Sequence, residues 1–456
     1  MTLWTAAGIA AATNGTASTD FAATGVAFDS REVGPGDLFV ALTGESTDGH
    51  RFLDQAFAQG AAGALVSRET AHPAVRVDDT FVALEDLARA SRARTAAKVI
   101  GVTGSVGKTS TKEALFAALD RSPAKAAHRS VKSYNNHTGV PLSLARMPAA
   151  TDYAVFEMGM NHPGELLHLT TLVRPHVALV TTIALAHAEF FPDEVAIADA
   201  KGEIFRGLEP GGIAIVPFDS PHCARLTAAA RPHAGRIVTF GLDRGADVHP
   251  LEWIAAPSGG TFLTARVRDR ELSLTIAQPG DHWVANALAV LAAVDAVGGD
   301  LGLAGLALGE MGGLAGRGAR RSVRARNGAA TVIDESYNAN PASMRATLAV
   351  LAREPGRHVA ILGEMRELGE RGPGWHAELA EPILAARVEA AVLVGEAMTP
   401  LAEALEGKVD FVHVPDAATA LDHALGLIAP GDAVLVKGSN GVGLSAVVAG
   451  LAGGAG

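Results

Sequence analysis

The stretch that most limits how this chain can fold is residues 98–112, KVIGVTGSVGKTSTK. An apolar run, Lys98-Val-Ile-Gly-Val102, predicts a strand, and a glycine loop separates it from a run of good helix formers that begins at Lys108. Such a strand, loop and helix form a phosphate-binding layout, because free backbone N–H groups and the helix dipole both favour anions there. The alternative is an ordinary glycine turn before a helix, and the matching strand and helix on either side argue against it.

The loop departs from the common Walker pattern at one position. That pattern has a glycine five positions before Gly107, where this chain has Val102. We expect Lys108 to reach the terminal phosphates of a nucleotide and the hydroxyl of Thr109 to ligate Mg²⁺. The residues predicted to bind the nucleotide here are Gly104, Ser105, Val106, Gly107, Lys108, Thr109 and Ser110.

Alternating predicted strands and helices divide the chain into α/β units. With 456 residues the chain is too long for one ordinary core, so several domains are expected. We predict a small N-terminal unit at 1–85, a central unit with a mostly parallel sheet at 86–312, and a Rossmann-like unit at 313–456. The last unit has no phosphate-binding motif of its own, so we expect it to close over a nucleotide that the central unit holds.

Charge and cysteine usage exclude several kinds of partner and site. The net charge of −11 argues against a nucleic-acid partner held by a general basic surface. The single cysteine, Cys223, excludes a disulfide framework and a cysteine-based metal site, and it suits a reducing cytosol. No apolar run is long enough to predict a membrane span. We therefore expect a cytoplasmic protein.

Two predicted strands of the central unit lead into groups that suit a metal. Glu157 ends the strand that begins at Tyr153, and His187 follows the strand 176–183. Ligands of open parallel sheets bind outside the carboxyl ends of the strands, and a carboxylate there suits Mg²⁺. A surface glutamate and a structural histidine are the alternatives.

Lys201 lies where a lysine is not expected. A helix is predicted from Pro192 to the turn at Pro210, and its apolar stripe includes Ile197 and Ile204. Lys201 comes four residues after the first and three before the second, so it lies on the buried stripe. A lysine there must snorkel, pair with an anion or be chemically modified.

Together these motifs resemble the Mur ligases, the ATP-dependent amide-forming enzymes of bacterial peptidoglycan synthesis. The resemblance covers the whole chain, and the family has its own variant of the phosphate loop, which accounts for Val102. The family more often has Asp where Glu335 and Glu364 stand, and often Arg at Asn440. The residues that carry the resemblance are Asp29-Ser-Arg31, Thr103–Thr109, Tyr134-Asn-Asn136, Glu157-Met-Gly159, Ala200-Lys-Gly202, Asp334–Pro341 and Leu362–Gly369.

The resemblance implies a role for each candidate residue. Lys108, His187 and Lys201 would be catalytic, with Thr109 and Glu157 holding one Mg²⁺ and His187 and Lys201 helping to hold a second. The lysine that matches Lys201 is carbamylated by CO₂ in this family, which would turn the misplaced cation into a metal-binding anion. Further contacts are implied to adenine from Asn286, to the nucleotide from Arg317 and Asp334 or Glu335, and to the UDP-linked substrate from Ser30, Arg31, Asn135 and Asn136.

The resemblance also implies partners and a reaction. The substrates would be ATP, UDP-N-acetylmuramoyl-tripeptide and D-alanyl-D-alanine, joined through an acyl phosphate by a monomer. A family member that adds the third peptide residue is the nearest alternative, although the Asn-Pro-Arg motif expected of it is not found after Pro341. Folylpolyglutamate synthetase is a more distant relative, and Asp29-Ser-Arg31 argues against it. A P-loop kinase or a nucleotide-gated binding module would keep the phosphate loop but would not need Lys201 on a buried stripe.

Overall fold

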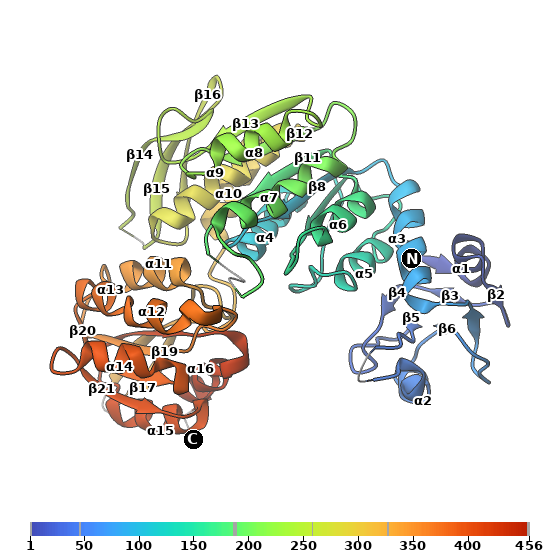
Figure 1. The fold of residues 1–456 in the computed structure, drawn as a ribbon. Coiled ribbons are helices and arrows are strands. Elements are labelled where there is room, and N and C mark those ends of the chain that lie inside the picture. The colour runs from blue at the N-terminus through green and yellow to red at the C-terminus, as the bar shows by residue number, and fades with distance from the viewer. Residues whose placement is uncertain (1, 45–46, 186–188, 258, 326–327, 454–456) are drawn as a thin grey trace.

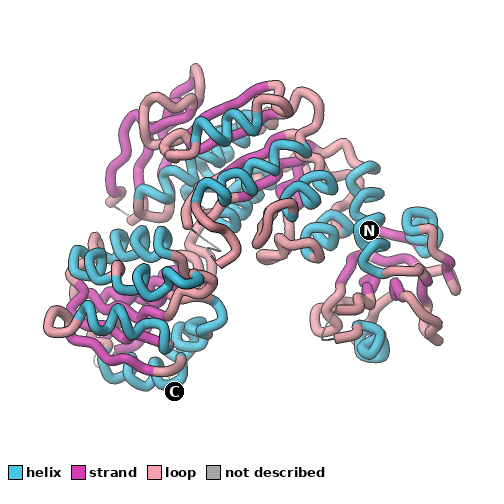
Figure 2. The backbone as a smooth tube through the Cα atoms, in the orientation of Figure 1, coloured by secondary structure: helices cyan, strands magenta, loops and turns pink. Residues whose placement is uncertain are grey.

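A computed structural model describes residues 2–44, 47–185, 189–257, 259–325 and 328–453. They form an N-terminal, a central and a C-terminal α/β domain, which confirms the predicted fold class (Figure 1). Each domain has its own β-sheet with helices packed on it (Figure 2). The N-terminal and C-terminal domains lie at different ends of the central domain, so the molecule is elongated (Figure 1).

The N-terminal domain has a sheet in the order β2-β7-β6-β5-β4, in which only the pairing of β2 with β7 is antiparallel among the described strands. The last helix, α3, crosses residue 85 and packs against both α1 and the central-domain helix α5, so this helix joins the two domains. The elements are β1 (Trp4–Thr5), α1 (Ala6–Thr13), β2 (Thr16–Ala17), β3 (Ala22–Ala23), β4 (Gly25–Ala27), β5 (Asp37–Val40), α2 (Leu53–Ala58), β6 (Gly63–Val66), β7 (Ala74–Arg76) and α3 (Thr80–Ala93).

The central domain has a sheet in the order β16-β15-β14-β13-β12-β11-β8-β10-β9. Helices α4, α9 and α10 pack on one face of the sheet and α5 to α8 on the other. The strands are β8 (Lys98–Thr103), β9 (Ala127–Arg129), β10 (Tyr153–Glu157), β11 (Val177–Val180), β12 (Ile213–Pro217), β13 (Arg236–Phe240), β14 (Val248–Ala255), β15 (Thr261–Val267) and β16 (Arg270–Ile276). The helices are α4 (Lys108–Asp120), α5 (Gly139–Ala145), α6 (Glu165–Val173), α7 (Glu194–Gly202), α8 (Cys223–Ala230), α9 (Asp281–Ala296) and α10 (Leu301–Glu310).

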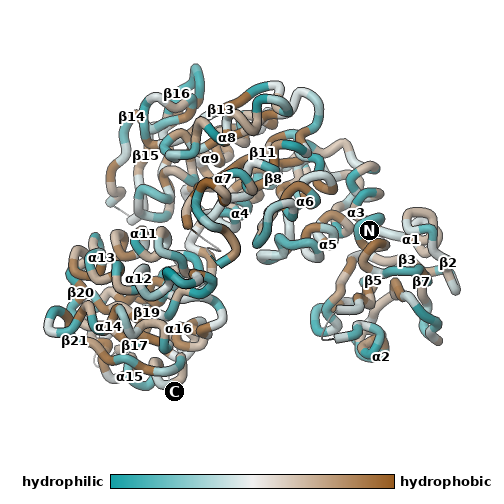
Figure 3. Tube along the Cα trace, viewed as in Figure 1, coloured by the Kyte–Doolittle hydropathy of each residue, from teal (hydrophilic) through white to brown (hydrophobic). Residues whose placement is uncertain are grey.

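The order of these strands positions the phosphate loop. Strand β8 lies between β10 and β11 and is parallel to both, so the chain leaves β8 at a point where the strand order reverses. Crevices at such points are where open α/β sheets bind ligands. The strands β8 and β11 are strongly apolar, as expected for strands covered on both faces (Figure 3).

One predicted helix boundary is wrong. The helix expected to run from Pro192 to Pro210 is α-helical only to Gly202 and continues as a 3₁₀ helix over Glu203–Gly207. At this change of geometry the carboxylate of Glu203 accepts hydrogen bonds from the backbone of Gly164 and Leu167, at the start of α6. The sequence does not predict this change, because the apolar stripe continues through both geometries and no proline or glycine pair interrupts the chain before Pro210.

The C-terminal domain has a sheet in the order β17-β18-β22-β19-β20-β21, parallel except for the hairpin of β17 and β18. The strands are β17 (Ala319–Ala325), β18 (Gly328–Glu335), β19 (His358–Gly363), β20 (Val388–Val394), β21 (Asp410–Val414) and β22 (Ala433–Lys437). The helices are α11 (Pro341–Leu351), α12 (Gly372–Ala377), α13 (Ala380–Ala385), α14 (Thr399–Leu405), α15 (Ala417–Leu427) and α16 (Leu444–Gly453). Among the residues described, no helix has the length and apolar character needed to cross a membrane.

Candidate active site

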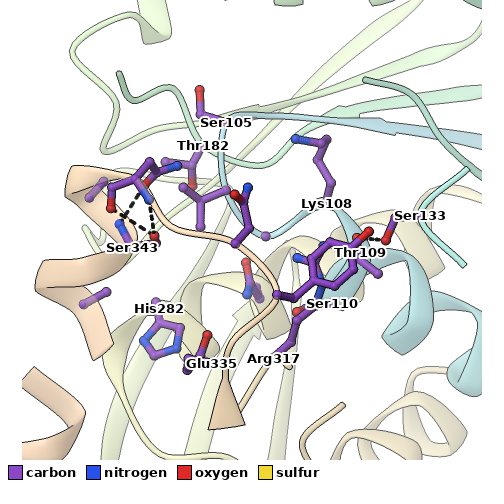
Figure 4. A pocket seen from close by; sticks show the side chains of 18 of the residues that line it. Ser105, Lys108, Thr109, Ser110, Ser133, Thr182, His282, Arg317, Glu335 and Ser343 are labelled. Carbon is purple, nitrogen blue, oxygen red and sulfur yellow. Dashed lines mark hydrogen bonds between the residues drawn. The ribbon is translucent and has the colours of Figure 1, made fainter. Parts of the chain in front are cut away.

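A cavity of about 370 Å³ lies where the carboxyl edge of the central sheet meets the C-terminal domain (Figure 4). The phosphate loop and the start of α9 line it from the central domain. The turn after β18, the start of α11 and Lys437 line it from the C-terminal domain. A ligand in this cavity would therefore contact both domains.

Two glycines give the phosphate loop its shape. Gly104 has φ +151°, and a Cβ atom there would lie 1.9 Å from the hydroxyl oxygen of Thr181. Gly107, with φ +87°, is the N-cap of α4, and a Cβ atom on it would lie 2.9 Å from Oδ1 of Asn286. Only glycine fits such crowded, left-handed positions without strain. Val102 is fully buried in the strand before the loop, so the loop turns at Gly104 rather than at the Walker position.

The segment after β11 holds the loop from the other side. The amide of Ser105 donates to the carbonyl of Thr182 at 2.7 Å, and its hydroxyl donates to the carbonyl of Ala184 at 2.8 Å. The hydroxyl of Thr181 donates to the carbonyl of Val106 at 2.6 Å. The first turn of α4 also lines the cavity, and the first N–H groups of any helix lack partners within the helix, which suits an anion site.

Lys108 lies at the start of α4, and its ammonium donates to the carbonyl of Gly104 at 2.7 Å. Burial is the main cause that lowers the pKa of Lys108, and the carboxylate of Glu157 opposes that shift. Figure 4 shows Lys108 and Thr109 on the wall of the same cavity. This places a cation beside the N-terminus of α4, where both favour phosphate.

One carboxylate oxygen of Glu157 accepts no hydrogen bond from the described residues, and the ammonium of Lys112 lies 4.0 Å from it. Its Oε1 accepts a hydrogen bond from the side-chain amide of Asn135 at 2.8 Å, and its backbone N–H donates to the hydroxyl of Ser130 at 2.8 Å. The residue is 1% exposed, and its Oε2 has no hydrogen-bond partner among the described residues. The hydroxyl of Thr109, also on the cavity wall, is 3.4 Å from that of Ser133, its one side-chain contact among the described residues. A buried carboxylate oxygen that accepts no hydrogen bond, in the same cavity wall as the hydroxyl of Thr109, fits a hard cation such as Mg²⁺.

Lys201 is 1% exposed, which confirms the prediction that it lies on the buried face of its helix. No hydrogen bond or ion pair joins its side chain to another of the described residues, in contrast to the ordinary rule for buried charges. Burial lowers its pKa well below the usual value for lysine, and the nearby charge of Lys108 adds to the shift. The other predicted group here, His187, lies outside the described residues.

The predicted nucleotide contacts of α9 and the C-terminal domain meet at the cavity. Asn286 lies against Gly107, and the guanidinium of Arg317 stacks over the ring of Tyr337 at 4.2 Å. The carboxylate of Asp334 accepts hydrogen bonds from the amide of Gly316 and from Ser336, and so it fixes the turn that carries Arg317. Glu335, the next residue, lines the cavity itself.

The candidates for the UDP-linked substrate come from two adjoining segments, because Phe28 packs against Tyr134 and Glu32 pairs with Lys132, but each candidate has a different partner. The hydroxyl of Ser30 donates to Gln55 inside the N-terminal domain, whereas Arg31 is 80% exposed and pairs with Asp29. Asn135 bonds Glu157, as described above. The side chain of Asn136 accepts from the amides at 138 and 139 and so caps the start of α5.

Sequence reasoning missed the role of Lys112, one helical turn after Lys108. It is fully buried, and its ammonium contacts the carboxylate of Glu113 and the carbonyls of Ser130 and Lys132. A signal was present, because Lys112 precedes Leu115 by three residues and so lies on the apolar stripe of α4. The same argument had singled out Lys201.

Comparison with known proteins gives matches along the whole chain. The family model described as "Mur ligase family, catalytic domain" matches residues 22–99, the "Mur ligase middle domain" matches 102–294, and the "Mur ligase, glutamate ligase domain" matches 319–440. The UDP-N-acetylmuramoyl-tripeptide--D-alanyl-D-alanine ligase of Escherichia coli is 35% identical over 430 residues, which cover 93% of each chain. The ligase of the same name from Bacillus subtilis is 32% identical over 435 residues, 93% of this chain and 92% of that one.

Solved structures agree with these matches. A crystal structure of MurF from Acinetobacter baumannii superposes with a TM-score of 0.85 at 32% identity and covers 98% of both chains. The MurF ligase of Thermotoga maritima in complex with ADP gives a TM-score of 0.78 at 26% identity and covers 94% of this chain and 96% of that one.

Proposed function

Since the chain belongs to the Mur ligase family, we infer that it is an ATP-dependent peptide ligase that joins D-alanyl-D-alanine to UDP-N-acetylmuramoyl-tripeptide. The products are UDP-N-acetylmuramoyl-pentapeptide, ADP and phosphate, and the reaction belongs to peptidoglycan precursor synthesis. The observation that carries the conclusion is that the phosphate loop and Glu157, whose Oε2 has no hydrogen-bond partner among the described residues, line one cavity in a chain with whole-length relatives of this name.

The reaction proceeds in two displacements, and the protein supplies no nucleophile. The terminal carboxylate of the tripeptide attacks the γ-phosphorus, and the bond from that phosphorus to the bridging oxygen breaks to release ADP. The amine of D-alanyl-D-alanine then attacks the acyl carbon, loses a proton and expels phosphate. Lys108 and the amides of the loop hold the transferred group in line and neutralise its charge.

We propose that Thr109 and Glu157 hold one Mg²⁺. The Oε2 of Glu157, which accepts no hydrogen bond from the described residues, supports this assignment. The ion would neutralise the charge that develops on the phosphate oxygens. Asn135 would then orient the carboxylate through its bond to Oε1.

A second metal ion is proposed at Lys201, with the lysine carrying a carbamate and His187 as a further ligand. The lowered pKa of Lys201 supports the modification, because only the uncharged amine attacks CO₂. The amine nitrogen bonds to the carbon of CO₂, loses its proton and leaves an anion in place of a cation. An anion beside Lys108 and a divalent cation is a far better occupant of this buried position than an unpaired ammonium.

The remaining predicted contacts are proposed as follows. Asn286 would contact adenine, and Arg317 with Asp334 or Glu335 would contact the nucleotide from the C-terminal domain. Asn286, Arg317 and Glu335 line the cavity, which supports their proposed contacts. Asp334 instead accepts a hydrogen bond from Gly316 and so supports the turn that carries Arg317. Residues Ser30, Arg31, Asn135 and Asn136 are proposed contacts of the UDP-linked substrate.

The setting of the reaction is also a proposal. We propose a cytoplasmic protein, because ATP is a substrate and the one cysteine suits a reducing compartment. We further propose that the chain acts as a monomer. One chain is enough to form the cavity, since residues of its own central and C-terminal domains line it.

One assay tests the function directly. The purified protein receives ATP, Mg²⁺ and UDP-N-acetylmuramoyl-tripeptide, and phosphate release is followed with and without D-alanyl-D-alanine. We expect sustained release only with the dipeptide, together with a pentapeptide product in the mass spectrum. Release that does not depend on the dipeptide would contradict the assignment. A UDP-muramoyl dipeptide with a free third amino acid is the control, and turnover of that pair would indicate the ligase that adds the third residue.

A further inference from the structure

Lys112 is a buried cation in an unfavourable place. It lies in the first turns of α4, where the positive end of the helix dipole disfavours a positive charge, and it is fully buried. Such a lysine is stable only if nearby groups compensate it. The ammonium is 2.9 Å from the carboxylate of Glu113 and 3.1 Å from the carbonyl of Ser130, and it also donates to the carbonyl of Lys132.

The two carbonyls belong to a segment, residues 130–136, that we call the metal-edge loop. The hydroxyl of Ser130 accepts a hydrogen bond from the backbone amide of Glu157 at 2.8 Å. The side-chain amide of Asn135 donates to the carboxylate of Glu157, also at 2.8 Å. The hydroxyl of Ser133 is 3.4 Å from that of Thr109. The metal-edge loop therefore contacts both residues proposed to hold the first Mg²⁺.

The conformation of this loop needs support. Lys132 has φ +51°, in the left-handed region that residues other than glycine seldom adopt. Two contacts hold it: its carbonyl accepts from Lys112, and its side chain pairs with Glu32 of the N-terminal domain. Glu32 also accepts a hydrogen bond from the hydroxyl of Tyr134 at 3.0 Å. The loop is thus held by Lys112 of α4 and by Glu32 of the N-terminal domain.

We propose that Lys112 is a positioning residue that holds the metal-edge loop against Glu157 and Thr109, so that the metal site is formed before the metal binds. The inference rests on the proposed function. Its action is through position rather than charge, because the carboxylate of Glu113 at 2.9 Å compensates the ammonium more closely than Glu157, whose Oε2 is 4.0 Å away. A second contact of Glu113, to Arg129 at 2.7 Å, anchors that carboxylate in turn.

The test compares Lys112→Met with the wild type and with Lys125→Met. Lys125 follows the same helix and pairs with Asp152 on the surface, so its variant also loses one lysine and one ion pair. Two quantities are measured: the affinity for Mn²⁺ in the presence of ADP, by electron paramagnetic resonance, and the affinity for ADP without metal. We expect Lys112→Met to weaken Mn²⁺ binding about 10- to 100-fold and to leave metal-free ADP binding unchanged. Lys125→Met should match the wild type in both.

Three results would overturn the inference. One is wild-type Mn²⁺ affinity in Lys112→Met, and another is an equal loss of metal-free ADP binding, which indicates general damage. The third comes from Glu32→Gln, which releases the loop from the N-terminal domain and remains informative if Lys112→Met does not fold. We expect this variant to lose much less Mn²⁺ affinity than Lys112→Met, because the carbonyl of Lys132 still accepts from Lys112. An equal loss would assign the positioning role to the contact with the N-terminal domain. Failure of the wild type to bind Mn²⁺ with ADP would instead contradict the proposed function.

Discussion

Two lysines, one in each of the two domains that form the cavity, are almost equally buried but differ in their surroundings. Lys437, at the end of β22 in the C-terminal domain, is 2% exposed, and Lys201, on α7 in the central domain, is 1% exposed. Lys437 donates to the carbonyl of Asn338 at 2.9 Å and lies 3.6 Å from the carboxylate of Glu335. Lys201 has no such partner among the described residues, and the charge that acts on it is that of another lysine, Lys108.

The difference separates a structural cation from one that needs a further group. Burial lowers the pKa of both lysines, but Glu335 opposes the shift at Lys437, while Lys108 increases it at Lys201. A buried pair is complete without a ligand. A buried amine in positive surroundings is poised to lose its proton, and so to react, which is the state that a carbamate requires.

The largest expected effect is that of Lys201→Ala. If Lys201 acts as a carbamate that holds metal, its removal should lower turnover on the order of a thousandfold, as for other groups that stabilise transition-state charge. Folding should be kept, because the substitution removes an unpaired buried amine rather than half of a pair. Turnover and the thermal midpoint are measured together. Near-full activity in this variant would contradict the proposed carbamate. Lys201 would then be no more than a buried structural lysine, like Lys437.

A second prediction concerns Lys108, the cation that makes the surroundings of Lys201 positive. Lys108→Ala should lower turnover about 100-fold, because the ammonium stabilises charge on the transferred phosphoryl group. Binding of UDP-N-acetylmuramoyl-tripeptide, measured by calorimetry without ATP, should be unchanged. An equal loss of turnover and of substrate binding would place Lys108 outside the phosphate site.

The contrast also indicates which features the sequence could predict. Strand β8, its glycine loop and the buried position of Lys201 follow from local patterns, because apolar periodicity and glycine spacing are written in neighbouring residues. The antiparallel strands β14 to β16, by contrast, were not predicted, because alternation of strands and helices says nothing about a strand's direction.

The contacts of a buried lysine are harder to predict from the sequence than its burial. That Lys112 lies on an apolar stripe is visible in the sequence, but its bonds are to residues 18 and 20 positions further along the chain. The pairing of Glu32 with Lys132 joins two domains across 100 positions. Only the packed structure tells a compensated lysine, such as Lys437 or Lys112, from an uncompensated one.

The smallest effect should come from the paired lysine. Lys437→Met leaves the carboxylate of Glu335 buried without its cation, which should lower the free energy of unfolding by about 2 kcal/mol. Burial raises the pKa of Glu335 and the charge of Lys437 opposes this, so the pKa should rise further in the variant. A carboxyl whose folded-state pKa is raised stabilises the fold while it is protonated, and that contribution is lost as the pH rises through the folded-state pKa.

The loss of stability in Lys437→Met should therefore be larger at pH 8 than at pH 5, as urea unfolding at both values would measure. Glu335→Gln combined with Lys437→Met is the matched control, since it removes the charge that was left unpaired. It should recover most of the loss and abolish the difference between the two pH values. If Lys437→Met is instead as stable as the wild type at pH 8, the pair does not compensate Lys437, and this lysine is no better satisfied in the fold than Lys201.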